Sequence, residues 1–141
     1  MNIRTVREWM TPNPITITPH TTLPEAHRSM DENKVRRLPV INKGKLVGIV
    51  TRGDIRAAQA SEATTLSVYE LNYLLDLIPA KDFMAYDPIT VTPNATIGEV
   101  AHLMLQHKIG GLPVVENGEL VGIITETDLC RLLMLESGVA K

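Results

Sequence analysis

Residues 38–54 read LPVINKGKLVGIVTRGD, and residues 112–128 repeat them as LPVVENGELVGIITETD. The offset is 74 residues at every position. From Met10/Met84 to Arg56/Cys130 the two copies align without a gap, with 20 identities in 47 positions. In each copy two apolar runs flank a Gly turn, and the second run closes on Gly-apolar-apolar-Thr-x-x-Asp. An unbroken register of this kind indicates an internal duplication, and it organises the interpretation of the whole chain.

Each copy predicts the same order of elements: strand, helix, strand, strand, helix. In the first copy the alternation of residues 15–18 suits a short strand, and Thr22 with Glu25 forms a capping box at the start of a helix. In the second copy Thr96 and Glu99 form the matching box. The later strands and the last helix of the first copy are expected over 38–42, over 46–51 and from Arg52 onward.

The turn between the two long strands is the strongest local signal. Asn117-Gly118 favours a two-residue hairpin because both residues tolerate positive φ, and Lys43-Gly44 stands at the equivalent place. Residues 4–10 predict a short amphipathic helix or turn in which Trp9 is a packing anchor.

About 50 residues with three short strands bury too little apolar surface to be stable alone, so the two copies are expected to share a core. The fold class we predict is α+β, with two β-α-β-β-α repeats related by pseudo-two-fold symmetry. The predicted boundaries are 6–60 for the first repeat, 61–80 for a linker with a polar loop and a short helix, and 81–136 for the second repeat. The linker helix carries one apolar face and is expected to pack on the repeats or on a partner chain; that face holds Leu71, Leu74, Leu75 and Ile78.

Composition excludes several classes of protein. The net charge of −2 argues against a general binder of nucleic acid or of membrane surfaces, which would carry a basic excess. No apolar run approaches the roughly 20 residues of a membrane span, and the first ten residues lack the apolar core of a signal peptide. Cys130 is the single cysteine, which fits a reducing compartment, and we expect it to be a packed thiol. A cytoplasmic location is therefore expected.

The sequence contains no familiar catalytic pattern. A phosphate-binding Gly-x-x-x-x-Gly-Lys-Ser/Thr loop, a Gly-x-Ser-x-Gly elbow and a His-Glu-x-x-His helix are all absent, and the four histidines lack metal-ligand spacing. We therefore expect no catalytic residues, no metal site and no enzymatic activity.

Thr51 and Asp54, with Thr125 and Asp128 in the second copy, are the main candidates for a site. Taken alone, Thr followed three residues later by Asp predicts a helix N-cap. A helix N-terminus can also bind an anion, so the cap leaves a ligand-binding role open.

The copies differ in charge around this motif. The first copy has Arg36, Arg37 and Arg52, whereas the second has Gly110, Gly111 and Glu126. Guanidinium groups can pair with phosphate in a bidentate fork, and a glutamate would oppose it. The alternative is that the three arginines form a solvated face.

The duplicated Leu-Pro-Val, Gly-turned hairpin and Thr-x-x-Asp motifs resemble the paired CBS (cystathionine β-synthase) domain, or Bateman module. The resemblance covers residues 6–135, and the linker LSVYELNYLL at 66–75 is also similar to that of small bacterial stand-alone CBS pairs, including acetoin-utilisation proteins. It implies a regulatory module that binds AMP, ADP, ATP or S-adenosylmethionine in the cleft between the repeats, with no cofactor required.

The resemblance also implies roles for the repeated motifs. The Asp would accept hydrogen bonds from the ribose hydroxyls with the Thr beside it, and basic residues before Leu-Pro would contact phosphate. The Thr-apolar-Thr-Pro segments, which otherwise read as edge strands, would line the adenine slot, and Leu-Pro would form its apolar wall. The implied ligand-binding residues of the first copy are Thr16, Ile17, Pro19, Arg36, Arg37, Leu38, Pro39, Thr51, Arg52 and Asp54. Those of the second copy are Thr90, Val91, Pro93, Gly111, Leu112, Pro113, Thr125 and Asp128.

We therefore expect a sensor that reports to an unidentified protein target by a conformational or oligomeric change. The first site would prefer phosphorylated nucleotides, and the second would be weaker or take a less charged adenosine ligand. The resemblance further implies a homodimer formed by the helix faces at 97–105 and 126–135 and their equivalents at 23–30 and 52–60. The alternative is a structural or protein-interaction module whose ligand sites are empty or degenerate.

Overall fold

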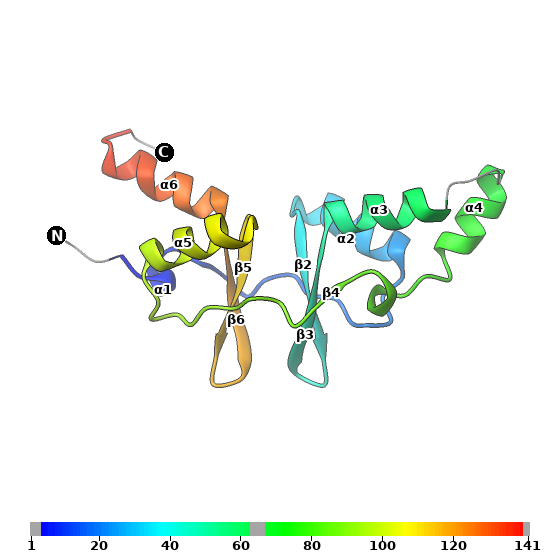
Figure 1. The fold of residues 1–141 in the computed structure, drawn as a ribbon, viewed down its shortest axis with the longest axis horizontal. Coiled ribbons are helices and arrows are strands. Elements are labelled where there is room, and N and C mark those ends of the chain that lie inside the picture. Colours follow the sequence, from blue (N-terminus) through cyan, green and yellow to red (C-terminus); the bar gives the residue numbers. More distant parts are fainter. Residues whose placement is uncertain (1–3, 63–66, 140–141) are drawn as a thin grey trace. The chain divides into compact units, whose positions relative to one another are not determined.

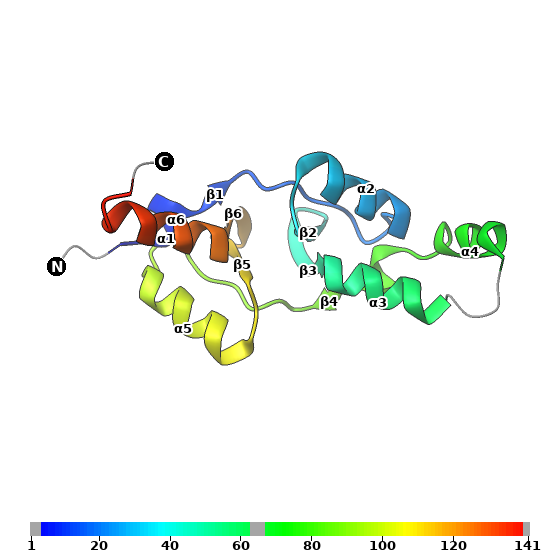
Figure 2. The ribbon, with the colours of Figure 1, turned by 90° about the horizontal axis from the view of Figure 1, so that it is seen from above.

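The computed structural model describes residues 4–62 and 67–139 and divides the chain into two compact units. The first-repeat unit is Ile15–Pro88, and the second-repeat unit joins Met1–Pro14 to Ile89–Lys141. Each unit has one three-stranded antiparallel sheet with helices packed against it (Figures 1 and 2). This confirms the α+β class and, in each repeat, the order helix, strand, strand, helix.

The first-repeat unit is built on a sheet with strand order β2-β3-β4. Its strands are β2 (Arg37–Asn42), β3 (Lys45–Thr51) and β4 (Ala85–Tyr86), and its helical elements are α2 (Leu23–Asn33), α3 (Arg52–Glu62), α4 (Val68–Leu75) and the 3-10 turn η1 (Ala80–Asp82).

The second-repeat unit has the corresponding order β1-β6-β5. Its strands are β1 (Thr11–Pro12), β5 (Gly111–Glu116) and β6 (Glu119–Thr125), and its helices are α1 (Val6–Trp9), α5 (Ile97–His107) and α6 (Glu126–Glu136).

The short strand near the start of each repeat pairs with the hairpin of the other repeat. Strand β1 pairs with β6, and β4 pairs with β3. The glycines at these contacts are equivalent: a Cβ atom on Gly48 would lie 2.6 Å from the Met84 sulfur, and one on Gly122 would lie 2.6 Å from the Met10 sulfur. The sequence repeat and the compact unit therefore have different boundaries. The aligned repeats begin at Met10 and Met84, whereas the chain passes from one compact unit to the other after Pro14 and after Pro88.

The local signals at the turns and helix ends are confirmed. Lys43 and Gly44 have φ of 52° and 78°, and Asn117 and Gly118 have φ of 54° and 81°, as a two-residue hairpin of this type requires. Helices α2 and α5 both begin with complete capping boxes.

The strand predicted at residues 15–18 is wrong, because only one isolated bridge forms there, between Ile17 and Val40. The amide of Ile17 donates to the Pro39 carbonyl at 3.0 Å, and the amide of Ile41 donates to the Ile17 carbonyl at 2.8 Å. Extending this parallel ladder would need an N–H from Pro19 to the Ile41 carbonyl and one from Pro39 to the Ile15 carbonyl, and proline has no N–H to donate.

Each unit has its own hydrophobic core. Leu38 and Val50 are fully buried in one, and Leu112 and Ile124 are fully buried in the other. The linker packs on the first-repeat core, where Leu75 is buried, which confirms that it is not a free tether. Residues 63–66, which include most of the expected polar loop and Leu66 of the linker motif, lie outside the described residues.

Cys130 is exposed on α6, so the prediction of a packed thiol is wrong. The Cys130 side chain lies on the solvent-facing side of α6, whereas the Leu132 side chain is buried. Over the part of the chain that the structure describes, no helix is both long and apolar enough to cross a lipid bilayer.

Candidate ligand site

The Thr51–Asp54 corner lies where β3 ends and α3 begins. The Thr51 amide donates to Oδ2 of Asp54 at 2.9 Å, and the Asp54 amide donates to the Thr51 hydroxyl at 3.2 Å. These reciprocal bonds form the predicted cap. Oδ1 of Asp54 takes no part in it, so the carboxylate is held in place while one of its oxygens lies outside the cap.

Asp54 also lines a hollow of about 380 Å³ inside the first-repeat unit. This volume lies within the range of about 300–1,000 Å³ that is typical of small-molecule pockets. The lining combines small, apolar and acidic side chains from α3 and from the segment after α4: Ala57, Ala58, Ser61, Ile78, Asp82 and Phe83.

The backbone brings the predicted first-copy segments together beside this corner. Arg37 pairs with Thr51 across β2 and β3, and the Arg52 amide donates to the Arg36 carbonyl at 3.1 Å. The bridge between Ile17 and β2 places the Thr16–Pro19 segment on the other side of β2. Residues 16–19, 36–39 and 51–54 therefore lie side by side in one unit.

Several side chains in these segments are structural. Ile17 and Leu38 belong to the hydrophobic core, and Pro39 is fully buried, so any contact they make with a ligand would use the main chain. Thr16 and Arg36 are exposed.

The Arg52 side chain does not lie with Asp54. Its guanidinium donates to Asp31 of α2 at 2.9 Å, on the other side of α3. A helix advances about 100° per residue, so Arg52 and Asp54 are separated by about 200° around α3. The structure thus divides the three predicted arginines: Arg36 and Arg37 stand at the strand end, and Arg52 faces α2.

The equivalent corner of the second-repeat unit has a different electrostatic environment. Oδ2 of Asp128 accepts from the Thr125 amide at 2.9 Å and from the Thr125 hydroxyl at 3.3 Å. Arg131 donates to Oδ1 at 3.0 Å, and Asp128 is only 2% exposed. Both oxygens are therefore engaged, whereas the residue equivalent to Arg131 in the first copy is Ala57.

The remaining second-copy segments repeat the backbone arrangement. The Val91 amide donates to the Pro113 carbonyl at 3.1 Å, and Gly111 pairs with Thr125. Buried side chains include Val91, Pro93, Leu112 and Pro113, while Thr90 is exposed.

Sequence reasoning missed Asp82 and Phe83 in the hollow and Arg131 on Asp128. The helical spacing of Asp54, Ala57 and Ser61 indicates one face and could have identified that wall. Asp82 and Phe83 carried no such signal, because they lie beyond the linker and reach α3 only through tertiary packing. Among the described residues, no group of three or more His, Cys, Asp or Glu is placed to hold a metal ion.

Comparison with known proteins identifies the family. The model of the CBS domain matches residues 6–61 and 80–135. The chain belongs to the CBS domain family. Both copies of the 74-residue repeat are therefore CBS repeats.

Curated relatives include proteins of very different length. The chain is 40% identical over 116 residues to an inosine-5'-monophosphate dehydrogenase of Korarchaeum cryptofilum, spanning 82% of this chain but only 21% of the dehydrogenase. It is 35% identical over 131 residues to a CBS domain-containing protein of Dictyostelium discoideum, spanning 92% of this chain and 90% of that protein. CBS pairs like this one thus occur both within large enzymes and in short chains.

Solved CBS pairs have the same fold. An acetoin utilization protein (AcuB) of Vibrio cholerae matches with a TM-score of 0.79 and 34% identity, covering 99% of this chain and 100% of that one. The CBS pair of protein MJ0100, in complex with 5'-methylthioadenosine and S-adenosyl-L-methionine, matches with a TM-score of 0.82 and 28% identity, covering 96% and 99%. CBSX2 in complex with AMP matches with a TM-score of 0.79 and 30% identity, covering 95% and 98%.

Proposed function

We propose that this CBS pair is a regulatory module that binds an adenosine-containing ligand, either an adenine nucleotide or S-adenosylmethionine. The observation that carries the proposal is Asp54, whose carboxylate is fixed by the cap and borders an open hollow. An ionised carboxylate only accepts hydrogen bonds, which suits the two hydroxyl donors of a ribose. The AMP complex of CBSX2 and the S-adenosylmethionine complex of MJ0100 support this ligand class.

Charge around the corner supports a phosphorylated ligand at the first repeat. Arg36 and Arg37 stand beside Thr51, whereas Asp82 adds one carboxylate to the hollow. The arginines offset the two carboxylates of Asp54 and Asp82, and because a guanidinium can hold phosphate in a bidentate fork, we propose that the first repeat prefers AMP, ADP or ATP. The second repeat has Gly110 and Gly111 in place of the arginines and would bind such ligands more weakly.

The proposed activity is regulation without turnover. A ligand shifts a conformational or oligomeric equilibrium when it binds one state more tightly than the other. The resulting change would be transmitted to a protein target.

Isothermal titration calorimetry with AMP, ATP and S-adenosylmethionine tests the proposal, using wild type, Asp54→Asn and Asp128→Asn. Asparagine keeps an acceptor for the capping amide and removes the charge, so the fold should be preserved. Losing a charged hydrogen-bond acceptor costs about 1.5–3 kcal/mol, so Asp54→Asn should weaken AMP binding by at least about tenfold. Asp128→Asn is the matched control and should have a smaller effect.

Two results would count against it. Absence of binding heat for all three ligands in the wild type would refute adenosine recognition. A larger loss of AMP affinity in Asp128→Asn than in Asp54→Asn would refute the ranking of the two repeats.

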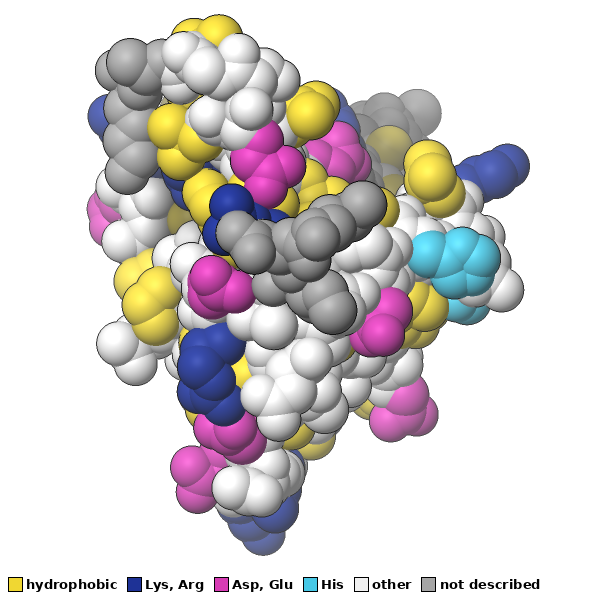
Figure 3. All heavy atoms as spheres, turned by 90° about the vertical axis from the view of Figure 1, so that its left-hand side faces the viewer, with side chains coloured by type: hydrophobic (Ala, Val, Ile, Leu, Met, Phe, Trp, Pro, Cys, Tyr) yellow, Lys and Arg dark blue, Asp and Glu magenta, His cyan; other side chains and the backbone are white. Residues whose placement is uncertain are grey.

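A second candidate function, a protein-interaction module that forms a homodimer, is favoured by exposed leucines on the second repeat. Leu105 on α5 is 81% exposed and Leu133 on α6 is 67% exposed. Apolar side chains reach the surface among charged ones on the face shown in Figure 3. We propose that these two helix faces associate with a second copy of the chain, because burying leucine removes apolar area from water.

Replacing Leu105 by Asp and Leu133 by Gln, the residues found at the equivalent first-repeat positions, tests this association. Sedimentation velocity should show a dimer for wild type and a monomer for the double variant. A wild-type monomer at all concentrations, with and without AMP, would refute the homodimer. No change in melting temperature with any adenosine ligand would favour the interaction module over the sensor.

A further inference from the structure

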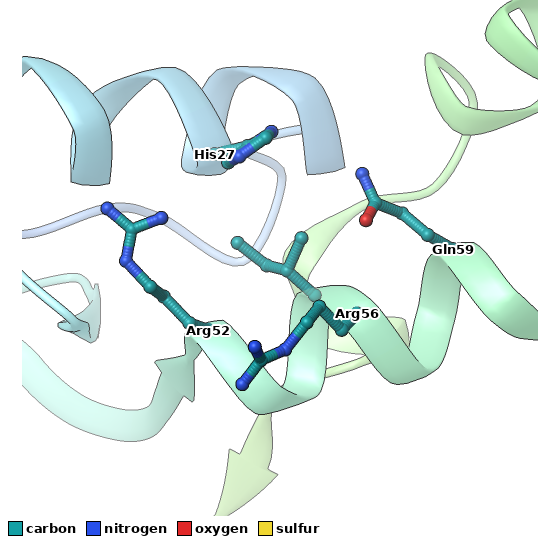
Figure 4. Close-up of a pocket in the computed structure, with 5 residues that line it drawn as sticks. His27, Arg52, Arg56 and Gln59 are labelled. Carbon is teal, nitrogen blue, oxygen red and sulfur yellow. The ribbon is translucent and has the colours of Figure 1, made fainter.

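A small basic hollow of about 130 Å³ lies between α2 and α3 of the first-repeat unit, apart from the Asp54 corner. In Figure 4, His27 lies at the edge of α2 that faces α3, and Arg52 and Gln59 reach up from α3. Arg56 also lines the hollow, but its guanidinium runs down along α3, away from α2, and the buried Ile55 completes the lining. The lining therefore combines two arginine side chains, an imidazole and an amide, and of the two guanidinium groups it is that of Arg52 that reaches toward α2.

The hollow and the proposed adenosine site use opposite faces of α3. At about 100° per residue, Arg52, Arg56 and Gln59 lie within about 60° of one another around the helix. The Asp54 hollow uses the face about 180° away, which carries Asp54, Ala57, Ala58 and Ser61. A phosphate group of a ligand held by Asp54 would not reach this basic hollow, so the two sites are separate.

The charges in the hollow are only partly balanced. Asp31 of α2 accepts from Arg52 at 2.9 Å and lies 3.5 Å from Nε2 of His27. Within residues 4–62 and 67–139, Arg56 has no ion pair with any carboxylate. Two like charges four residues apart on a helix destabilise it slightly, and the pair Arg52 and Arg56 carries one more positive charge than Asp31 offsets.

We propose that this hollow binds a phosphate group, as inorganic phosphate or as a small phosphate monoester. Guanidinium groups form bidentate hydrogen bonds with phosphate oxygens, and the Gln59 amide offers two further donors. The size agrees with this ligand, because about 130 Å³ is well below the range of about 300–1,000 Å³ for drug-sized ligands. The site is independent of the adenosine proposal.

The second repeat lacks this chemistry. At the positions equivalent to His27, Arg52, Arg56 and Gln59 it has Ala101, Glu126, Cys130 and Leu133. Phosphate binding of this kind is therefore expected once per chain.

Titration of the ¹⁵N-labelled chain with inorganic phosphate, at constant ionic strength maintained with chloride, tests the site. In wild type the α2 and α3 amides around His27 and Gln59 should shift and saturate. Arg56→Gln should weaken the affinity by about tenfold, because it removes a charged donor from the site. Arg28→Gln is the matched control, since it removes the same charge from an exposed position on α2 outside the hollow and should leave the affinity unchanged.

Equal weakening in Arg28→Gln and Arg56→Gln would overturn the site, since it would reveal only a general response to charge. Absence of saturable shifts in wild type would also overturn it. Asp54→Asn should retain phosphate binding even if it loses AMP, which separates this site from the adenosine site. Tighter binding of glycerol 3-phosphate than of inorganic phosphate would identify a monoester as the source of the phosphate group, and the reverse order would identify the free ion.

Discussion

The last helix of each CBS repeat, α3 in one and α6 in the other, occupies the same place in the fold but presents different surfaces. Helix α3 directs Arg52 toward α2, where it pairs with Asp31, and leaves Asp54 beside an open hollow. Helix α6 exposes Leu133 and covers its equivalent aspartate with Arg131. The duplicated sequence has thus kept its core, caps and hairpins while both outer faces of this helix have diverged, and we expect function to have diverged there too.

The glycines against which β4 and β1 pack should give the largest effects on stability. Alanine at Gly48 or Gly122 places Cβ 2.6 Å from a methionine sulfur and about 3 Å from a backbone carbonyl. Overpacking of this kind costs about 1–3 kcal/mol, and the two variants should lose similar amounts because their contacts match. Chemical denaturation followed by circular dichroism measures the loss.

Gly53→Ala is the control for these variants. Gly53 lies in α3 with no atom closer than 3.6 Å to an added Cβ, so alanine should stabilise the chain by up to about 1 kcal/mol. A normal stability for Gly48→Ala and a reduced one for Gly122→Ala would show that the two sheet edges are not equivalent.

Exchanging the residues three positions after the two aspartates should have the next largest effect, which is on ligand affinity. Ala57→Arg would give Asp54 the partner that Asp128 has, and Arg131→Ala would remove it from Asp128. We expect Ala57→Arg to lower AMP affinity by about tenfold, since a new ion pair competes for the carboxylate, and Arg131→Ala to raise binding at the second repeat. Calorimetry would measure both, and an unchanged affinity in Ala57→Arg would contradict the role assigned to Asp54.

The fold could be predicted from sequence wherever the signal is local or repeated. Hairpins at Gly44 and Gly118 and the caps at Thr22 and Thr96 depend on a few neighbouring residues, and the duplication supplied each prediction twice. The strand at 15–18 failed because alternation describes the side chains and not the backbone donors, so it did not reveal that only Ile17 can pair with β2.

The candidate site was less predictable because it depends on long-range contacts. The motif identified Asp54 and Asp128 as equivalent, yet their surroundings differ through Ala57 and Arg131, one turn further along each helix. The prediction that Arg52 contacts the phosphate of a ligand at the Asp54 corner took no account of the direction of its side chain, which faces Asp31 of α2.

The capping boxes of α2 and α5 should stabilise their helices by similar amounts, because both repeats have kept the same Thr and Glu. The hydroxyl of Thr22 accepts from the Glu25 amide at 3.4 Å, and that of Thr96 accepts from the Glu99 amide at 3.1 Å. Thr22→Ala and Thr96→Ala should each cost about 1 kcal/mol in urea denaturation. A loss confined to one variant would show that one repeat dominates the measured stability. Serine keeps the capping hydroxyl, so Thr→Ser at either position should retain most of the stability that Thr→Ala loses.

The pH dependence of the first cap should be the smallest effect. Hydrogen bonds from the Thr22 amide and then the Thr22 hydroxyl lower the pKa of Glu25 below its usual 4.5; desolvation opposes them, and the charge of Arg28 makes the smallest contribution. A carboxyl with a lowered pKa in the folded state stabilises the fold above its unfolded pKa and loses that contribution as the pH falls through the folded value. Wild type should therefore be slightly more stable than Glu25→Gln at pH 7, and urea denaturation at pH 3 should find the difference reduced. A difference that stays constant between the two pH values would mean that the Glu25 charge contributes nothing to the cap, since glutamine can supply the same acceptor to the Thr22 amide at either pH.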